Sequence, residues 1–407
     1  MRELHDSGIE WIGIAPSSWK VAYLSSVLSE RKHKNVGMQE DNLLSLSYGN
    51  VKQKDINTND GLLPESFEGY NIIEVGDIVL RLTDLQNDHR SLRTGLCRER
   101  GIITSAYCTL KLNSKEDDPR FLRYYLHCFD LCKGFYGMGA GVRQGLNFDG
   151  IRKIEMLLPA PAEQTAISDY LDAQMEKVDA LIANQQAQIE KLKQYKQSLI
   201  TEVVTKGLNP NAPMKDSGVE WIGMMPEHWQ LIRFRFIADI TTGNSDTQDA
   251  NPDGAYPFYV RSPIVERSND YTFEGPGILM AGDGAGAGRV FHLVDGKYAV
   301  HQRVYRFYNF RYVDKELLKY YLENLFSTVM DYGSAKTTVP SVRLPMIQNF
   351  QVCVPPLAEQ EKMVEIIRKH ASSIDKLIDI KEKKIEKLTD YKKSLIYEYV
   401  TGKKEVS

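Results

Sequence analysis

The sequence predicts an α+β protein that contains two mixed α/β domains, two long coiled-coil helices and a pseudo-twofold internal repeat. An octapeptide, Asp-Ser-Gly-Ile/Val-Glu-Trp-Ile-Gly, occurs at 6–13 and again at 216–223, each time followed by a Pro and a Trp. A second block begins with Ala-Glu-Gln at 162 and at 358 and ends with Tyr-Lys-Gln/Lys-Ser-Leu-Ile. The segments between these blocks share little similarity. A constant frame around a variable insert, present twice, predicts two readers held on one scaffold.

Length and composition exclude several classes of protein. A chain of 407 residues is expected to form two or more domains. No apolar run approaches the ~20 residues that span a bilayer, and the polar N-terminus predicts no signal peptide, so we expect a cytoplasmic protein without a membrane partner. The five cysteines lack metal-ligand spacing and are expected to be reduced thiols. The net charge of −3 requires that any nucleic-acid surface concentrate its cations on one face or share the contact with a partner.

The two repeated helical blocks carry an apolar residue at alternating spacings of four and three, which is typical of a coiled-coil seam. The seam positions are Val178, Ile182, Gln185, Ile189, Leu192, Lys196, Leu199 and Val203, and then Ile374, Ile378, Lys381, Ile385, Leu388, Lys392, Leu395 and Tyr399. Polar residues interrupt both seams at matching places. They either fix the register, or the lysines extend to solvent while Tyr195 and Tyr391 cover the seam.

Start and stop signals bound each helix. Pro161 and Pro356 precede an early Glu, and Gly207 and Gly402 follow the last periodic residues. A break near residues 175–177 stays open. These signals divide the chain into four segments: a first domain with its anchor block (1–160), a spacer helix (161–208), a linker with the second anchor block and domain (209–355), and a second spacer helix (356–407).

Each variable segment has the pattern of a compact α+β domain. We expect short buried strands at 77–80, 101–104, 277–280 and 298–300, and helices with apolar stripes at 120–132 and 315–330.

Catalytic motifs are not found. The glycine-rich stretch 282–289 follows a strand but lacks the Lys-Ser/Thr of a P-loop, and the next residues read as a strand, so no helix N-terminus is available for a pyrophosphate. A tight glycine hairpin that lets the backbone approach another group is favoured. Asp253 and Asp295 only faintly match a nuclease carboxylate set, and His301 is expected to be structural or a DNA contact. We therefore expect no enzyme activity, no catalytic residue and no metal site.

Both variable segments contain donor-rich loops whose side chains suit base edges and phosphates. Any one of these residues can equally be an ordinary solvated loop residue, but their clustering indicates DNA binding. The candidates are Tyr48, Asn50, Lys52, Arg81, Thr83, Gln86, Asn87, Arg90, Arg93, Arg143 and Gln144 in the first segment, and Arg261, Arg289, Gln302, Arg303, Lys336, Thr337, Thr338, Ser341 and Arg343 in the second.

At this point the chain resembles the specificity (S) subunits of type I restriction-modification systems. The resemblance rests on the paired octapeptides, the paired Ala-Glu-Gln helices, and Gly-Asp-Ile-Val-Leu-Arg at 76–81 with Gly-Ile-Ile-Thr-Ser-Ala-Tyr at 101–107. It implies two target-recognition domains that each read half of a bipartite double-stranded DNA site, separated by two antiparallel coiled-coil helices that set the spacing.

The resemblance also implies partners. Two copies of the methyltransferase (M) subunit would dock on the helices, and restriction/translocase (R) subunits would complete the enzyme. S-adenosylmethionine, ATP and Mg²⁺ would belong to those partner subunits, with no cofactor in this chain. The alternative is a coiled-coil adaptor whose two globular domains bind protein or RNA.

Overall fold

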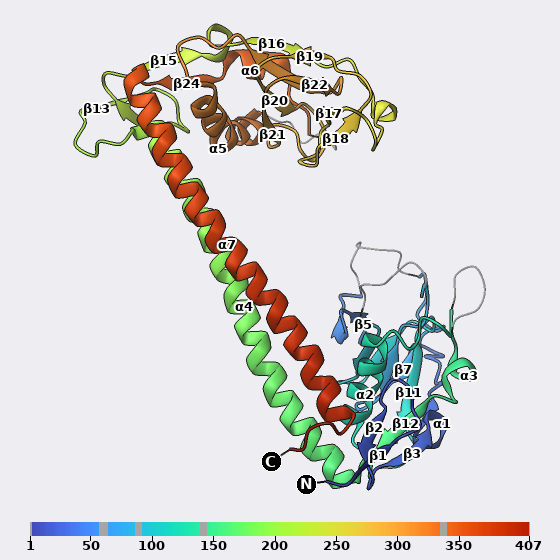
Figure 1. The fold of residues 1–407 in the computed structure, drawn as a ribbon. Helices are drawn as coiled ribbons and strands as arrows, with labels where there is room; N and C mark the ends of the chain where they lie inside the picture. The colour runs from blue at the N-terminus through green and yellow to red at the C-terminus, as the bar shows by residue number, and fades with distance from the viewer. Residues whose placement is uncertain (1, 57–63, 86–91, 139–144, 334–339, 407) are drawn as a thin grey trace. The chain divides into compact units, whose positions relative to one another are not determined.

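The computed structural model describes residues 2–56, 64–85, 92–138, 145–333 and 340–406, with the side chains of 329–333 left out (Figure 1). The chain divides into two compact units. Unit 1 comprises residues 1–185 and 383–407, and unit 2 comprises residues 186–382. Each unit therefore contains one variable domain together with half of each long helix. No helix in the described ranges is long and apolar enough to cross a membrane.

The two long helices are continuous, α4 over Pro161–Lys206 and α7 over Leu357–Val400 (Figure 1). The break that residues 175–177 left open does not occur. Pro161 occupies the first position of α4, where its missing N–H costs nothing. Gly207 and Gly402 follow the two helices with φ of 76° and 70°, the left-handed conformation that ends helices. At 1.5 Å per residue, the 46 residues of α4 extend about 69 Å.

Within each unit the two helix segments pack antiparallel along the expected seam. In unit 2, Lys196 reaches Asp375 at 2.7 Å and Lys381 donates to Gln188, so the numbering falls along one helix as it rises along the other. In unit 1, Lys392 pairs with Asp179. The lysines in the seam thus pair with the facing helix. The idea that Tyr195 and Tyr391 cover the seam is wrong, because these residues are 57% and 49% exposed.

Unit 1 is built on a four-stranded antiparallel sheet in the order β4-β11-β8-β9. Its strands are β4 (Leu28–Glu30), β8 (Ile78–Leu80), β9 (Thr94–Leu96) and β11 (Cys108–Leu112). Four antiparallel pairs surround it: β1 (Leu4–Asp6) with β2 (Ile14–Pro16), β3 (Lys20–Tyr23) with β12 (Glu155–Leu158), β5 (Leu44–Ser47) with β6 (Asn50–Gln53), and β7 (Asn71–Ile73) with β10 (Gly101–Ile103). The helices are α1 (Leu24–Val27), α2 (Pro119–Leu131) and α3 (Phe148–Ile151). The expected strands at 77–80 and 101–104 and the helix at 120–132 are confirmed.

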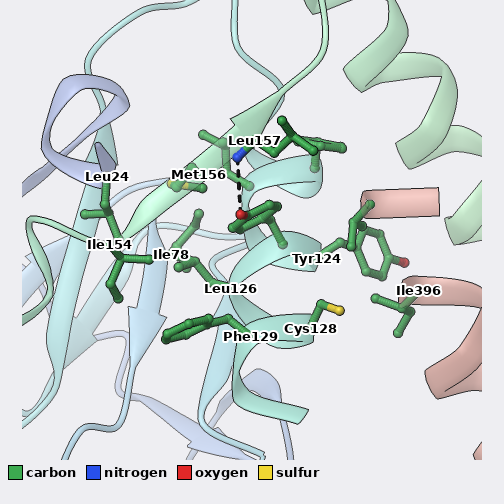
Figure 2. Close-up of a cluster of buried hydrophobic side chains, with 14 of the residues drawn as sticks. Leu24, Ile78, Tyr124, Leu126, Cys128, Phe129, Ile154, Met156, Leu157 and Ile396 are labelled. Carbon is green, nitrogen blue, oxygen red and sulfur yellow. Dashed lines mark hydrogen bonds between the residues drawn. The ribbon is translucent and has the colours of Figure 1, made fainter. Parts of the chain in front are cut away.

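The core of unit 1 joins the domain to the helix pair. In Figure 2, Leu126 and Phe129 of α2 lie on the side of Ile78 and Ile154, while Tyr124 and Cys128 are directed toward Ile396 of α7. The α4 residues Ile167, Leu171 and Met175 belong to the same buried cluster. Tyr125 fixes β12, because its hydroxyl donates to the Glu155 carbonyl at 3.1 Å and accepts from the Leu157 N–H at 3.2 Å. The helix pair in this unit is therefore part of the domain core.

Unit 2 contains two four-stranded sheets, β16-β23-β20-β21 and β18-β17-β22-β19. The first is antiparallel, with β16 (Asp239–Thr242), β20 (Gly277–Ala281), β21 (Phe291–Val294) and β23 (Val304–Tyr308). The second has β17 (Tyr256–Tyr259), β18 (Glu266–Ser268), β19 (Phe273–Glu274) and β22 (Lys297–Val300), and β17 runs parallel to β22. The remaining elements are β13 (Met214–Asp216), β14 (Met224–Pro226), β15 (Gln230–Arg233), β24 (Gln351–Val354), η1 (Phe234–Phe236), η2 (Thr247–Asp249), α5 (Lys315–Gly333) and α6 (Leu344–Asn349). The strands expected at 277–280 and 298–300 and the helix at 315–330 are confirmed.

The repeated octapeptides and the Pro and Trp that follow them attach each domain to both helices. In unit 1 the Trp19 indole donates to Glu163 at the start of α4 at 3.2 Å. Gly402, just beyond α7, lies so close to the same block that a Cβ there would stand 2.4 Å from Pro16 and 3.3 Å from Trp19. Lys403 also donates to the Ile12 carbonyl at 2.9 Å. The first block therefore meets the end of the last helix.

Unit 2 repeats this arrangement. The Trp229 indole donates to Glu359 at the start of α7 at 3.0 Å, and a Cβ on Gly207 at the end of α4 would lie 2.9 Å from the Trp229 ring. Each tryptophan therefore contacts the beginning of one helix and the end of the other. The internal sequence repeat is a repeat of this contact.

Candidate nucleic-acid interface

In unit 2, four segments meet at one end of the two sheets. They follow β17 and β20, connect β22 to β23, and precede α6. Gly282 donates its N–H to the Arg303 carbonyl at 2.9 Å, and Val342 donates to the Gly282 carbonyl at 2.8 Å. Gly284 donates to the Pro340 carbonyl at 3.0 Å. These backbone bonds bring Arg303 and the 340–342 segment onto the glycine-rich loop.

A single carboxylate holds two of the predicted site residues in this cluster. Asp283 accepts from Nη1 of Arg261 at 3.1 Å through one oxygen and from Nη1 of Arg303 at 3.3 Å through the other. The Asp283 side chain is 16% exposed, whereas those of Arg261 and Arg303 are 44% and 64% exposed. The arrangement presents two partly exposed guanidinium groups above a largely covered acid.

The glycines of the 282–288 loop are what allow this close approach. A Cβ on Gly286 would stand 2.5 Å from the Arg261 carbonyl oxygen, and a Cβ on Gly282 would stand 2.8 Å from that of Arg303. Only glycine fits such contacts. The predicted close approach to another backbone is confirmed, and β21 follows this loop as the expected strand. The hairpin is not tight as predicted, because residues 282–290 separate β20 from β21.

His301 supports the turn that carries Gln302 and Arg303. Its ring is 3% exposed, and its Nδ1 accepts the Arg303 backbone N–H at 3.0 Å. Burial, with a smaller contribution from Arg261, lowers the pKa of His301, so the neutral ring that accepts this bond is favoured. Gln302 donates from Nε2 to Asp246 at 3.3 Å. His301 is thus a structural residue, one of the two roles expected for it.

The remaining candidates of unit 2 lie around this cluster or outside the described residues. Ser341 forms an isolated antiparallel bridge with Asp283 and is exposed, as are Arg289 and Arg343. Arg343 directly precedes α6 as its N-cap residue. Lys336, Thr337 and Thr338 fall in 334–339, which the structure does not describe.

In unit 1, the hairpin of β5 and β6 presents three of the candidates. Tyr48 and Gly49 form its two-residue turn, with φ of 46° and 77°, and Tyr48 is 81% exposed. Asn50 and Lys52 are exposed and two residues apart on β6, so they share one face. A Cβ on Gly49 would lie 3.2 Å from Cβ of Leu92, so the hairpin turn packs beside the segment that leads into β9.

Arg93 has a different role from the one predicted. Its side chain is fully buried, and its guanidinium donates to the carbonyl oxygens of Arg81 at 3.1 Å, Thr83 at 2.8 Å and Asp84 at 3.3 Å. Its backbone N–H donates to Asp130 at 3.1 Å. A DNA contact by Arg93 is incompatible with this burial. Arg93 instead shapes the loop in which Arg81 is half-buried and Thr83 is exposed.

Five candidates of the first segment, Gln86, Asn87, Arg90, Arg143 and Gln144, lie outside the described residues. The candidates predicted from the sequence were mainly cationic and amide side chains. They did not include Asp283, the acid that holds two of them. An aspartate between glycines directly after a buried strand was the available signal.

In the described residues no three His, Cys, Asp or Glu side chains gather as a metal site. Asp253 and Asp295, the faint nuclease match, occupy exposed positions beside turns, where Asp295 pairs with Lys315 at 3.4 Å.

Comparisons with known proteins relate the chain to one group of proteins. Residues 226–390 match the family model "Type I restriction modification DNA specificity domain". The chain is 25% identical over 95% of its length to the type I restriction enzyme MjaVIII specificity subunit of Methanocaldococcus jannaschii, of which 93% is covered. It is 26% identical over 35% of its length to the EcoDI specificity subunit of Escherichia coli, of which 31% is covered. A chain from a solved structure concerned with complex assembly and conformational transition of a type I R-M system has the same fold, with a TM-score of 0.70 at 16% identity, covering 95% of this chain and 99% of that one.

Proposed function

We propose that this chain is a DNA specificity subunit of a type I restriction-modification enzyme, and that each of its two domains reads one half of a bipartite duplex site. The observation that carries the proposal is the repeat of the frame around two unlike loop clusters. Each tryptophan anchor holds its own domain on the helix pair, while the exposed polar side chains differ between units. Two weak readers on one stiff connector gain affinity only when both half-sites are correctly spaced.

Sequencing of methylated adenines tests this proposal in cells that express the chain with its methyltransferase. We expect one motif with two defined halves and an undefined gap. An Arg303→Ala variant is expected to relax one half and leave the other unchanged. A single continuous motif, or relaxation of both halves together, would contradict two independent readers.

The helices are proposed to set the gap, because unit 1 buries its helix segments in the same core as its domain. In unit 2, the corresponding core includes Ile200, Val203 and Val204 of α4 and Met363, Val364 and Ile367 of α7. Inserting one heptad into both helices keeps the seam and adds about 10 Å. That distance is roughly three base pairs at 3.4 Å each. An unchanged gap in the methylation motif of such a variant would refute the spacing role.

The helices are also proposed to dock two methyltransferase subunits. Leu181 and Tyr391 in unit 1, and Leu377 and Tyr195 in unit 2, are apolar side chains 46–57% exposed. Each residue immediately precedes a seam position, and the Lys392–Asp179 and Lys196–Asp375 pairs place the members of each pair at neighbouring levels. Two like apolar surfaces suit two like partners.

Native mass spectrometry of the purified complex tests docking. Tyr391→Glu is expected to remove one methyltransferase copy of two, and Tyr195→Glu the other. Lys393→Glu is the control, because Lys393 is exposed and lies beside Leu181 and Tyr391 without being one of the apolar residues. We further propose that methylation, ATP hydrolysis and cleavage belong to partner subunits, which hold S-adenosylmethionine, ATP and Mg²⁺. This proposal is supported by the resemblance of the chain to a family of DNA specificity domains.

A further inference from the structure

We infer that the half-site read by unit 2 contains a guanine, contacted in the major groove by the arginine pair that Asp283 holds. This inference rests on the proposed function and deepens it, because it assigns a base to one reader. The structural basis is the Arg261–Asp283–Arg303 cluster, whose three side chains come from three separate segments after or before strands of the two sheets.

The cluster has the features of a preorganised donor set. Asp283 engages only Nη1 of each arginine, so the other N–H donors of both guanidinium groups are not used on this carboxylate. Holding one edge of a planar guanidinium reduces the freedom that a base contact would otherwise cost. The backbone beneath is fixed as well, since Gly282 bonds to Arg303 at 2.9 Å and Val342 bonds to Gly282 at 2.8 Å.

The chemistry of the base edges selects guanine. Guanine presents two acceptors, N7 and O6, in the major groove, whereas adenine presents one acceptor beside an amino donor and cytosine presents an amino donor. Arginine has donors only, so two parallel N–H bonds match guanine alone. Asp283 itself is not the reader of a cytosine amino group, because both of its oxygens accept from arginines and its side chain is 16% exposed.

A phosphate contact is the competing role for the same arginines. Phosphate binding favours uncompensated cations, and a carboxylate within 3.3 Å of both guanidinium groups halves the charge that the pair offers. A guanidinium held in one orientation adds little to a phosphate contact, which any cation can make. The same fixed orientation does add discrimination between bases. The carboxylate therefore favours base reading.

The experiment uses the full chain in complex with its methyltransferase and a random duplex library from which bound sequences are selected. The wild-type complex first returns its motif. If no bipartite motif appears, the proposed function fails. If the motif appears but neither half contains a guanine that depends on this cluster, only the present inference fails.

The dependence is then measured with 7-deazaguanine, which lacks the N7 acceptor, at each guanine of the motif. At one guanine we expect wild-type affinity to fall by about 5- to 150-fold, the equivalent of one base-edge contact. In Arg303→Ala or Arg261→Ala, the same replacement is expected to have no further effect. Asp283→Asn, which keeps the shape and removes the charge, is expected to reduce discrimination at that base pair only.

Asp295→Asn serves as the matched control, because Asp295 lies in the β21–β22 turn at the opposite end of β21 and pairs with Lys315. The other half-site reports that each variant remains folded. Uniform loss across all sequences with a shallower salt dependence would show phosphate contacts and overturn the inference. An unchanged 7-deazaguanine effect in both arginine variants would overturn it as well.

Discussion

Ile396 offers a direct measure of how firmly a long helix is joined to its domain. It lies on α7, is 3% exposed, and faces Tyr124 and Cys128 of α2 (Figure 2). Ile396→Ala removes three carbon groups, worth about 2.4 kcal/mol at ~0.8 kcal/mol each. The cavity left behind brings the expected loss of unfolding free energy to about 2–5 kcal/mol.

The matched control is Ile380→Ala, which makes the same chemical change on the same helix at a side chain that is 60% exposed. It is expected to change stability by less than about 0.5 kcal/mol, because a largely exposed side chain loses little burial and alanine favours helices. Urea denaturation of both variants measures the difference. Hydrogen exchange assigns the loss, which should appear in the amides of α2 and spare those of α5.

Two results would refute this reasoning. A loss below about 1 kcal/mol for Ile396→Ala would show that the contact is not tightly packed. If amide exchange accelerated equally in α2 and α5, the destabilisation would not be local to the contact between α7 and the unit 1 domain. If the loss is local, methylation by the complex is expected to tolerate a wider range of gaps, since one reader is then less firmly held.

Three further predictions follow from single sites. Burial lowers the pKa of His127 from 6.5 to about 3, so on acidification the unfolded chain takes up a proton on His127 before the folded chain does. The free energy of unfolding therefore falls as the pH drops from 6.5 toward 3, by about 2 kcal/mol at pH 5. This loss should be absent in His127→Gln. Gly275→Ala, at φ 88° with open space around it, should cost about 1 kcal/mol, and Gly402→Ala about 1–3 kcal/mol more because of its contact with Pro16, both by thermal unfolding. Tyr48→Asn removes the exposed ring and introduces a residue type that tolerates φ 46°, so the melting temperature should not change. Binding to one half-site should weaken by about 1 kcal/mol or more.

The fold was predictable wherever local signals repeat. The seam of α4 and α7 follows from a regular spacing of apolar residues, and its ends follow from Pro161, Gly207 and Gly402, whose backbone preferences act without tertiary context. The buried strands were predictable for the same reason, as short apolar runs between turn residues. The division into two units was not, because each unit joins helix halves that are about 200 residues apart in sequence.

The site was predictable by residue type but not by role. Arg81 and Arg93 have the same side chain in one loop, yet Arg93 is fully buried on three carbonyl oxygens and Arg81 is only half-buried. What separates them is which carbonyls converge in the folded loop, and no spacing in the sequence encodes that. Asp283 meets arginines 22 and 20 residues away in the sequence because separate segments converge in the fold, so its role also appears only there.

The two repeats share the geometry with which a domain contacts its helices, but one charge pair at that contact is reversed. At positions 196 residues apart, Gln164 and Gln360 accept the N–H groups of Asp118 and Asp314 at 3.0 and 2.6 Å, so both domains approach their helices in the same way. The ion pair beside this contact is inverted. Arg120 of α2 donates to Asp169 of α4 at 2.7 Å and to Asp172 at 3.1 Å, whereas Arg368 of α7 donates to Glu316 of α5.

An α2-like helix docked on α7 would set Arg120 against Arg368, and an α5-like helix docked on α4 would set Glu316 against Asp172. Like charges in these places oppose the exchanged pairing, while the matched pairs favour the observed one. The common frame is therefore not interchangeable in its details. The reversal is confined to the Asp172 and Arg368 positions, since Glu365 stands at the place of Asp169, so charge distinguishes the two docking surfaces at one position while the anchors are the same.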